Sequence, residues 1–278
     1  MRLKTAPTKK DIVVVLVCLI FLAINVGAIS SGGRMRAKRV VCLTNLKQLT
    51  LAWTQYADDN DGFIVNGAPL GRECQADPGF GDHAGEIPWV GRDWAYMTGQ
   101  QLQDCQENAI RDGALWPYCQ ELKLYHCPTG YPTSIRSYGI VDGMNGFRRS
   151  GTIAGVHWIK NLEQILKPGE RIVFIDEGWV TPDSFAVYFD RELWWEDPPV
   201  RHGDGTAQSF ADGHSEWHRW KGKWTVAKGT ALYSTGSSRP GEPINGEIIP
   251  ATIDDFHDLY WTQIGCWGEL GYTPSHPP

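Results

Sequence analysis

Residues 12–29 read IVVVLVCLIFLAINVGAI, and the chain runs on through VVCLTNLKQL at 40–49 and LAWTQYA at 51–57 to DDNDG at 58–62. The apolar run has about the length, roughly 20 residues, that a helix needs to cross a bilayer. No proline interrupts the stretch, and an Asp/Asn/Gly turn is a typical helix end. We therefore predict one long helix, half in lipid and half in water, that carries a head.

These segments divide the chain. A secretory signal peptide is the main alternative for the N-terminus. It fits poorly, because no clean small-x-small cleavage site follows the apolar run and Arg34-Met35-Arg36 comes at once. We therefore expect a retained anchor. The predicted parts are a cytoplasmic basic leader at 1–10, a transmembrane helix at 11–30, its continuation in water at 31–58 and an extracytoplasmic head at 59–278. Within the head we distinguish Cys-rich loops at 59–135, a sheet with a hairpin at 165–225 and a C-terminal extension at 226–278.

Composition limits the partners and suggests an orientation. The chain has 278 residues and a net charge of −6. A nucleic-acid binder normally carries a basic face, so this charge argues against nucleic acid as a partner. Basic residues flank the apolar run equally, so they give no orientation. Cys18 lies in the run and the other six cysteines follow it. An even number of cysteines in one loop-rich domain favours disulfides, which form in an oxidising compartment. We therefore expect a cytoplasmic N-terminus, an anchor in the inner membrane and a periplasmic or extracytoplasmic head.

The pairing of these cysteines is open, because six cysteines allow many connectivities. Free buried thiols are the alternative to disulfides. The pairs that we predict are Cys42–Cys127, Cys74–Cys105 and Cys119–Cys266.

The head combines short helices with a small sheet. Residues 172–175 are apolar and β-branched, as in a buried strand. Residues 206–210 and 214–220 alternate around Asp212-Gly213, which predicts a hairpin with His214, Glu216, His218 and Trp220 on one face. The other predicted elements are short helices near 94–101, 115–122 and 252–264, and strand-like pieces at 224–226 and 231–233.

Two motifs resemble a known family. One is CLTNLKQL at 42–49 with YADDNDG at 56–62, and the other is His202 followed after nine residues by Asp212-Gly213. Together they resemble the type II secretion pseudopilin-like proteins of planctomycetes, which have a prepilin-type N-terminus and a prepilin-associated His-x9-Asp-Gly motif. The resemblance implies a pilin-like fold, with His202, Asp212 and Gly213 holding the head together. The other residues that carry it are Cys42, Asn45, Leu46, Tyr56, Asp58, Asp59, Asn60, Cys127 and Pro128.

The same resemblance implies a processing site near the N-terminus. Prepilins carry Gly-Phe at the scissile bond and a Glu four residues on. Counting back from Cys42 places Ala6-Pro7 at the bond and Asp11 at the acidic position. Asp11 would then pair with the N-terminal amine of a neighbouring subunit and set the register of assembly. Pro7 departs from the family pattern.

Several acidic and imidazole side chains are candidate metal ligands. His202, Asp204, Asp212 and His214 lie around the hairpin, and Asp176 follows the strand at 172–175. Such N and O donors suit a zinc-like ion. The alternative is a solvated hairpin with His202 packed on the turn. Calcium is a second candidate, at Asp58, Asp59 and Asn60, although the match to an EF-hand loop is partial.

Aromatic residues suggest a contact site. The chain has 13 tryptophans, most of which we expect in the core. Trp194 and Trp195 precede Glu196-Asp197-Pro198-Pro199 and resemble an exposed loop that could stack on sugar rings. No Gly-x-Ser-x-Gly elbow or phosphate-binding loop occurs, so we expect no enzyme.

We therefore predict an α+β fold, in which the long N-terminal transmembrane helix packs on a small antiparallel β-sheet with disulfide-stapled loops. Val41, Leu46, Leu49 and Trp53 form the helix face expected to meet the sheet. The expected role is a structural or interaction protein among other pilin-like subunits or secretion-system components, anchored in membrane lipid. The alternative is a membrane-tethered module that binds a polysaccharide or a protein.

Overall fold

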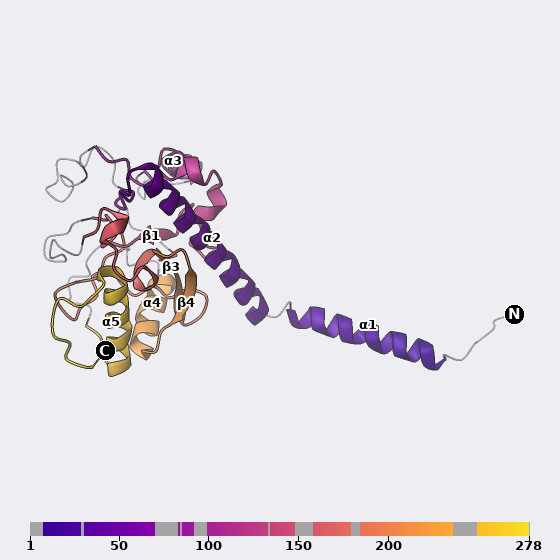
Figure 1. The fold of residues 1–278 in the computed structure, drawn as a ribbon. Helices are drawn as coiled ribbons and strands as arrows, with labels where there is room; N and C mark the ends of the chain where they lie inside the picture. Colours follow the sequence, from indigo (N-terminus) through magenta and orange to yellow (C-terminus); the bar gives the residue numbers. More distant parts are fainter. Residues whose placement is uncertain are drawn as a thin grey trace.

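Two helices lead into the head (Figure 1). The computed structural model describes the chain over residues 8–28, 31–69, 83, 85–91, 99–132, 134–147, 158–178, 184–235 and 249–277. Helix α1 spans Lys9–Ala28 and helix α2 spans Ser31–Asp59. The predicted single helix is thus described as two, with residues 29–30 outside the described part. Helix α1 points away from the head, and α2 lies across it.

The large apolar side chains of helix α1 are exposed. Its large apolar side chains between Ile12 and Ile24 are each 51% to 66% exposed. The predicted transmembrane segment at 11–30 falls on this helix. Across the described residues, no helix is both long enough and apolar enough to span a membrane.

Helix α2 is held by one buried face. Cys42, Leu46, Leu49 and Trp53 are completely buried, at the three- and four-residue spacing that places side chains on one side of a helix. Val41, which we expected on this face, is 48% exposed, because it lies one position away from the stripe. The helix ends as predicted, where the backbone N–H groups of Asn60 and Gly62 both donate to the carbonyl of Ala57.

The sheet has four antiparallel strands in the order β1-β2-β3-β4. Strand β1 is Tyr138–Ile140, β2 is Ile172–Asp176, β3 is Gly205–Phe210 and β4 is Ser215–Arg219. Tyr138 lies opposite Asp176, and Ala207 lies opposite Trp217. The buried strand at 172–175 and the hairpin are therefore confirmed. Strand β1 was not predicted, since it is short and its three residues are buried on both faces.

Helices cover both faces of the sheet, and successive side chains of β4 point to one face and then the other. On one face, Ser215 donates to the carbonyl of Leu43 in α2, and the Arg39 guanidinium lies 3.5 Å above the Trp217 ring. On the other face, the His218 ring stacks 3.7 Å from the ring of Trp261. Trp261 belongs to α5, Ile253–Trp267. The head is thus an α+β structure in which α2 and α5 enclose the sheet.

The C-terminal part is helical where strands were expected. Helix α4, Lys223–Thr235, replaces the predicted pieces at 224–226 and 231–233. Asp258 accepts hydrogen bonds from the backbone of Lys221 and Gly222, and Asp255 accepts one from Thr225. These carboxylates of α5 bind the N–H groups of the residues before α4 and of its first turn. The helix predicted at 252–264 is confirmed as α5, with Thr252 and Asp255 in a reciprocal capping box.

The loop region contains α3, Gly99–Arg111, and the short 3-10 helices η3, Trp116–Tyr118, and η4, Leu122–Tyr125. In place of the helix predicted at 115–122, the structure shows η3 within that range and the first residue of η4 at its end. Most of the one predicted at 94–101 lies outside the described residues. Among the described residues, two further 3-10 turns are η5, Leu162–Gln164, and η6, Pro168–Glu170.

The predicted disulfides are corrected by the structure. Cys42, Cys119, Cys127 and Cys266 are all free thiols, so the pairs Cys42–Cys127 and Cys119–Cys266 are wrong. Cys119 instead donates to the carbonyl of Leu115 and lies 3.1 Å from the Tyr125 hydroxyl. Cys74 lies outside the described residues, and with it the pair Cys74–Cys105. Burial and hydrogen bonds take the place that cross-links were expected to fill.

Candidate functional site

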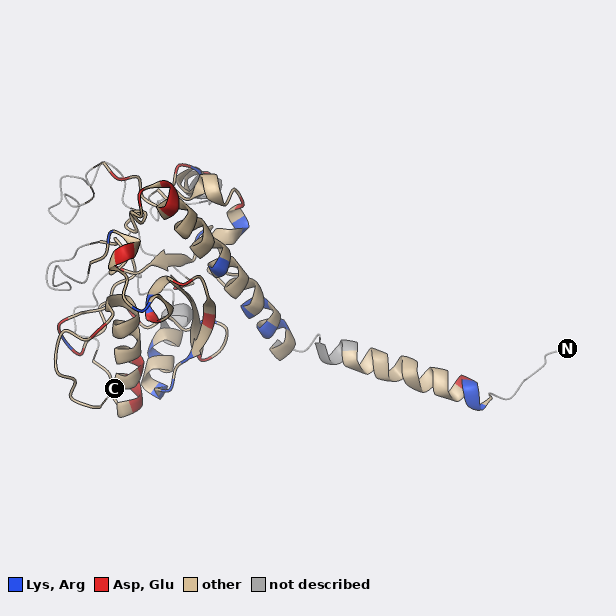
Figure 2. Cartoon of the chain, viewed as in Figure 1, with Lys and Arg blue, Asp and Glu red and all other residues tan. Residues whose placement is uncertain are grey.

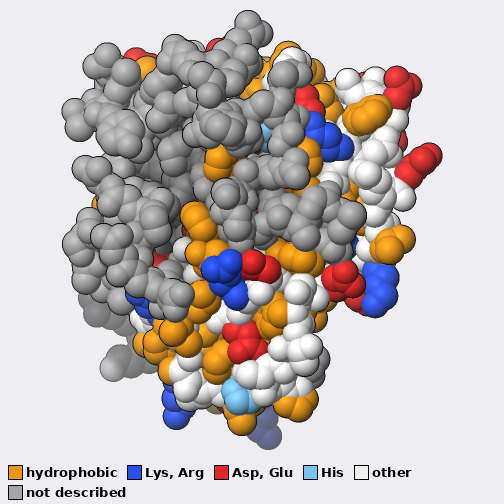
Figure 3. Space-filling view, turned by 90° about the vertical axis from the view of Figure 1, so that its left-hand side faces the viewer, with side chains coloured by type: hydrophobic (Ala, Val, Ile, Leu, Met, Phe, Trp, Pro, Cys, Tyr) orange, Lys and Arg blue, Asp and Glu red, His pale blue; other side chains and the backbone are white. Residues whose placement is uncertain are grey.

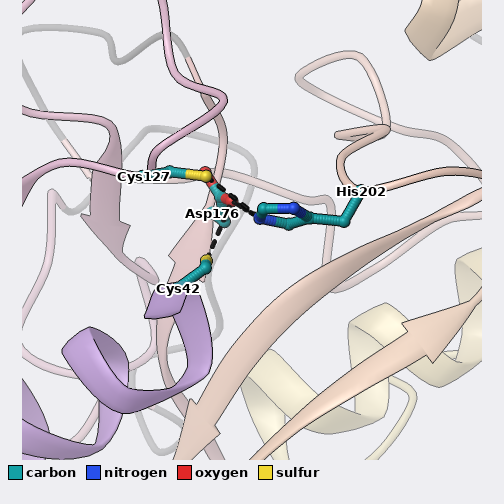
Figure 4. Close-up of side chains that lie close together, drawn as sticks. All are labelled: Cys42, Cys127, Asp176 and His202. Carbon is teal, nitrogen blue, oxygen red and sulfur yellow. Dashed lines mark hydrogen bonds and ion pairs between the residues drawn. The ribbon is translucent and has the colours of Figure 1, made fainter. Parts of the chain in front are cut away.

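Four metal-ligating side chains from four parts of the fold converge at one buried point (Figure 4). Cys42 comes from α2, Cys127 from the loop after η4, Asp176 from the end of β2, and His202 from the loop before β3. One donor atom of each lies within 4.8 Å of all the others, and all four residues are buried. Within the described part of the chain, no other group of three or more His, Cys, Asp or Glu residues converges in this way.

Direct contacts join the four donors. Cys42 Sγ donates to Asp176 Oδ2 at 3.2 Å, and Cys127 Sγ lies 3.0 Å from His202 Nε2. His202 Nε2 and Asp176 Oδ2 are 3.5 Å apart. The other carboxylate oxygen, Oδ1, accepts from the backbone of Gly178 at 3.0 Å and lies 3.8 Å from Arg201 Nε. Asp176 therefore turns one oxygen to the cluster and the other to its own loop.

The local structure explains how the two thiols meet. Cys42 lies one turn before Leu46 on the buried face of α2. Asn45 of the same helix donates to the carbonyls of Lys123 and His126, which ties the η4 segment to α2 just before Cys127. The backbone N–H of Cys127 then donates to Ser137 Oγ at 2.6 Å. A polar side chain on α2 thus fixes the loop that carries the second thiol.

The backbone at His202 is unusual. Its φ is 57°, in the left-handed region that non-glycine residues seldom adopt. Arg39 of α2 donates to its carbonyl at 2.6 Å. The loop is thus held in a strained conformation that turns the imidazole towards the two thiols and the carboxylate.

The electrostatics separate the two thiols. Burial, a hydrogen bond to Cys127 and the negative charge of Asp176 raise the pKa of Cys42 well above its usual value. Burial also opposes ionisation of Cys127, but hydrogen bonds from Cys42 and His202 lower its pKa to about 7. Burial disfavours the imidazolium, yet hydrogen bonds to Asp176 and Cys127 raise the pKa of His202 to about 9. A thiolate at Cys127 beside a protonated His202 is the charge state that these contacts favour.

The structure brings together only part of the predicted metal set. Asp176 and His202 belong to the cluster, but Asp204, Asp212 and His214 do not. Asp204 lies 3.7 Å from Arg219 at the surface. Asp212 Oδ1 is 2.6 Å from His214 Nδ1, within the hairpin turn that Gly213 forms at φ 90°. The predicted packing of His202 against this turn is also wrong, because its side chain contacts Cys127 and Asp176.

The two cysteines were missed as ligands because they were assigned to disulfides. The sequence did carry a signal: Cys42 and Cys127-Pro128 belong to the same family resemblance as His202. Nothing in the spacing, however, shows that residues this far apart in the chain meet. That information lies in the packing of α2 on the sheet.

The motif residues at the end of α2 hold the helix terminus. Asn60 donates to the carbonyl of Tyr56, and Asp59 accepts from the Tyr118 hydroxyl at 3.0 Å. The Tyr56 and Tyr118 rings meet edge to face, 6.2 Å apart. Asp58 is exposed. These residues, expected as a calcium candidate, act in the structure as a polar helix end.

The N-terminal and aromatic candidates have other positions. Asp11 accepts from both the backbone and the hydroxyl of Thr8, at 2.7 and 2.8 Å, and so caps α1. Ala6 and Pro7 lie outside the described residues. Trp194 is buried against Trp220, which corrects its assignment to an exposed loop. Trp195 is partly buried beside Tyr188.

Comparison with known proteins identifies no relative: no family model, no curated protein and no solved structure matches this chain.

Proposed function

We propose that this chain is a membrane-attached, pilin-like structural or interaction protein, in which α1 provides the attachment and the head provides the contact surface. The observation that carries the proposal is the apolar surface of α1. Its large side chains from Ile12 to Ile24 are exposed around the whole helix. Burying such surface is favourable by about 25 cal/mol per Å². Lipid, or the same helix of neighbouring subunits, would cover it.

The distribution of charge supports this proposal. Lys9 and Lys10 lie at the start of α1, and the exposed residues Arg34, Arg36 and Lys38 lie at the start of α2 (Figure 2). Between them, α1 carries Asp11 as its one charged residue after the first two lysines. Basic residues at both ends of an apolar helix suit the phosphate headgroups of a bilayer.

Membrane fractionation of the full chain tests the attachment. We expect the wild-type chain to sediment with membranes and to resist extraction by carbonate, whereas Ile20→Lys shifts protein to the supernatant, because a charge in apolar surroundings is costly. Leu166→Lys is the matched control, since Leu166 is an exposed apolar residue of the head. Wild-type protein in the supernatant would contradict the proposal.

Cross-linking tests the assembly. Cys18 is exposed on α1, so mild oxidation of the membrane-bound chain should join two copies through Cys18 if these helices bundle. The dimer should disappear in Cys18→Ser and persist in Cys119→Ser, which removes a buried thiol of the head. The intact mass of the same preparation reports processing, because a chain that begins at Pro7 would have been cleaved after Ala6. Absence of any Cys18-dependent dimer would remove the assembly role.

A second candidate function is a membrane-tethered binding module for a polysaccharide or a protein. The observation that favours it is the pair Trp195 and Tyr188, whose rings are 5.1 Å apart on a partly exposed loop. On the face drawn in Figure 3, hydrophobic side chains lie among charged ones in the described part, as in a surface that forms polar and apolar contacts together. Specific glycan binding by the full chain that is lost in Trp195→Ala would favour this candidate.

A further inference from the structure

We propose that Cys42, Cys127, Asp176 and His202 form a site for one divalent transition metal ion, Zn²⁺ by its donor chemistry, which fastens α2 to the sheet. Two thiolates, one imidazole and one carboxylate are the donors that zinc takes in proteins, and four of them complete a tetrahedral shell. Soft thiolate ligands argue against Ca²⁺ and Mg²⁺, which take oxygen.

The geometry is close to that of a metal shell. Metal–donor bonds of about 2.0–2.3 Å place the donors of a tetrahedral site roughly 3.3–3.8 Å apart. The contacts here are 3.0 Å between Cys127 Sγ and His202 Nε2, 3.2 Å between Cys42 Sγ and Asp176 Oδ2, and 3.5 Å between His202 Nε2 and Asp176 Oδ2. All four donors lie within 4.8 Å of one another. The donor separations exceed the tetrahedral range by at most about 1 Å, so side-chain shifts of that size would complete the shell.

The charges also balance. Two thiolates and one carboxylate carry three negative charges, of which a divalent ion neutralises two. Arg201, with its Nε 3.8 Å from Asp176 Oδ1, is buried beside the cluster and supplies the remaining positive charge. A buried ionic group is stable only when its charge is compensated in this way. Asp176 keeps Oδ1 for Arg201 and Gly178 and leaves Oδ2 for the ion.

Burial indicates a structural ion rather than a catalytic one. Cys42, Cys127 and Asp176 are completely buried, and His202 is 3% exposed. A catalytic zinc keeps an open position for water or substrate, whereas four protein donors leave none. The same burial argues against the other chemistry that Cys127 and His202 suggest, a nucleophilic thiolate, since a substrate could not reach the sulfur.

The position of the site in the fold gives the ion a role. The four ligands come from α2, the loop after η4, the end of β2 and the loop before β3. An ion bound by all four would join the helix that continues from α1 to the strands of the head. It would also hold His202 in its left-handed backbone conformation, at φ 57°. The inference does not depend on what α1 contacts, so it can fail or hold independently of the proposed function.

Cobalt titration of the full chain tests the site. The detergent-solubilised protein is kept reduced, stripped with a chelator and titrated with Co²⁺, whose visible absorption distinguishes a tetrahedral site and whose near-ultraviolet charge-transfer absorption reports thiolate ligands. We expect one Co²⁺ per chain with both signatures, and its displacement by Zn²⁺. Weak octahedral absorption without a thiolate signature would overturn the proposal.

Variants assign the ligands. Each ligand is removed in turn by Cys42→Ser, Cys127→Ser, Asp176→Asn and His202→Gln. Each variant should lower Zn²⁺ affinity by about a hundredfold or more, since the loss of an outer-shell contact alone lowers it by about 10- to 100-fold. Cys119→Ser and Cys266→Ser, which change buried thiols elsewhere, should leave the affinity unchanged. Equal losses in the control variants would contradict the assignment. The titration of the wild-type chain stands even if a variant fails to fold.

The redox state of the thiols provides an independent test. After a chelator has removed the ion and the chain has been denatured without reductant, Cys42 and Cys127 should both react with an alkylating reagent, because both are thiols. A Cys42–Cys127 disulfide in protein extracted from its native membrane without reductant would overturn the proposal, because a disulfide leaves no thiolate for the ion.

Discussion

Helices α1 and α2 follow one another in the chain, yet they obtain their stability in different ways. In α1 every large apolar side chain from Ile12 to Ile24 is exposed, whereas α2 buries Cys42, Leu46, Leu49 and Trp53 completely. The first helix is apolar around its whole circumference, and the second has one apolar face. The head covers the apolar face of α2, whereas the apolar side chains of α1 stay exposed. The head should therefore be stable without α1, while α1 depends on its surroundings.

Truncation of a buried α2 side chain should have the largest effect. Trp53→Ala leaves a large cavity in the core on the buried face of α2, and we expect it to lower the free energy of unfolding by about 3–5 kcal/mol. Phe21→Ala in α1, whose side chain is 66% exposed, should change it by less than about 0.5 kcal/mol. Denaturant unfolding of the full chain in detergent, followed by circular dichroism, measures both. Similar losses in the two variants would refute the distinction between the helices.

Loss of the polar contact between α2 and the loop should have the next largest effect. Asn45 is buried and donates to two carbonyls, at 3.2 and 3.1 Å. Asn45→Ala leaves both without this donor, so we expect a loss of about 1–3 kcal/mol. Thr44→Ala is the matched control on the exposed side of α2. If both variants unfold at the same denaturant concentration, Asn45 does not hold the loop.

The α5 side of the sheet should make stability depend on pH. Burial, with the nearby charge of Lys221, lowers the pKa of His218 from 6.5 to about 4. The folded state keeps the imidazole neutral, so the unfolded chain binds the proton first and stability falls as the pH drops from about 6.5 to about 4.

After allowance for partial exposure of His218, we expect a loss on the order of 1–2 kcal/mol over this range. Equilibrium unfolding at several pH values measures it. His218→Gln should flatten this part of the profile while other groups continue to titrate. An unchanged profile in the variant would show that His218 is not the responsible group.

The smallest effect should come from the cap of α1. Asp11→Ala removes the carboxylate that accepts two hydrogen bonds from Thr8, so the first turn of α1 should fray and the helical circular dichroism should fall slightly. The unfolding transition of the head should not move. If Asp11 instead sets the register between subunits, the variant will lose Cys18-dependent cross-linking while its helicity is retained, and the local cap will not be its main role.

The elements that could be predicted have a local cause. The hairpin follows from alternation around Asp212-Gly213, and Gly213 does adopt the positive φ that this turn requires. The start of α5 follows from Thr252 and Asp255, which form a capping box within four residues. The end of α2 follows from the turn at Asn60 to Gly62. In each case the residues that decide the structure are close together in the sequence.

The errors have a common cause as well. The sequence of α4 predicts strands, whereas a helix forms there with the N–H of Thr225 bound by Asp255, 30 residues further along the chain. Trp194 was placed on the surface because its neighbours are polar, although Trp220 and the core cover it. Cys42 and Cys127 were assigned to a disulfide, whereas both thiols remain free and point to Asp176 and His202.

The sequence by itself determined the apolar character of α1, the buried face of α2 and the hairpin, because each depends on periodicity or on a turn within a few residues. Only the tertiary structure decided which polar groups meet. Cys42, Cys127, Asp176 and His202 lie far apart in the chain, and they converge because α2 packs across the sheet and Asn45 fixes the loop beside it. Long-range packing places these donors in one buried cluster, and no local pattern encodes that position.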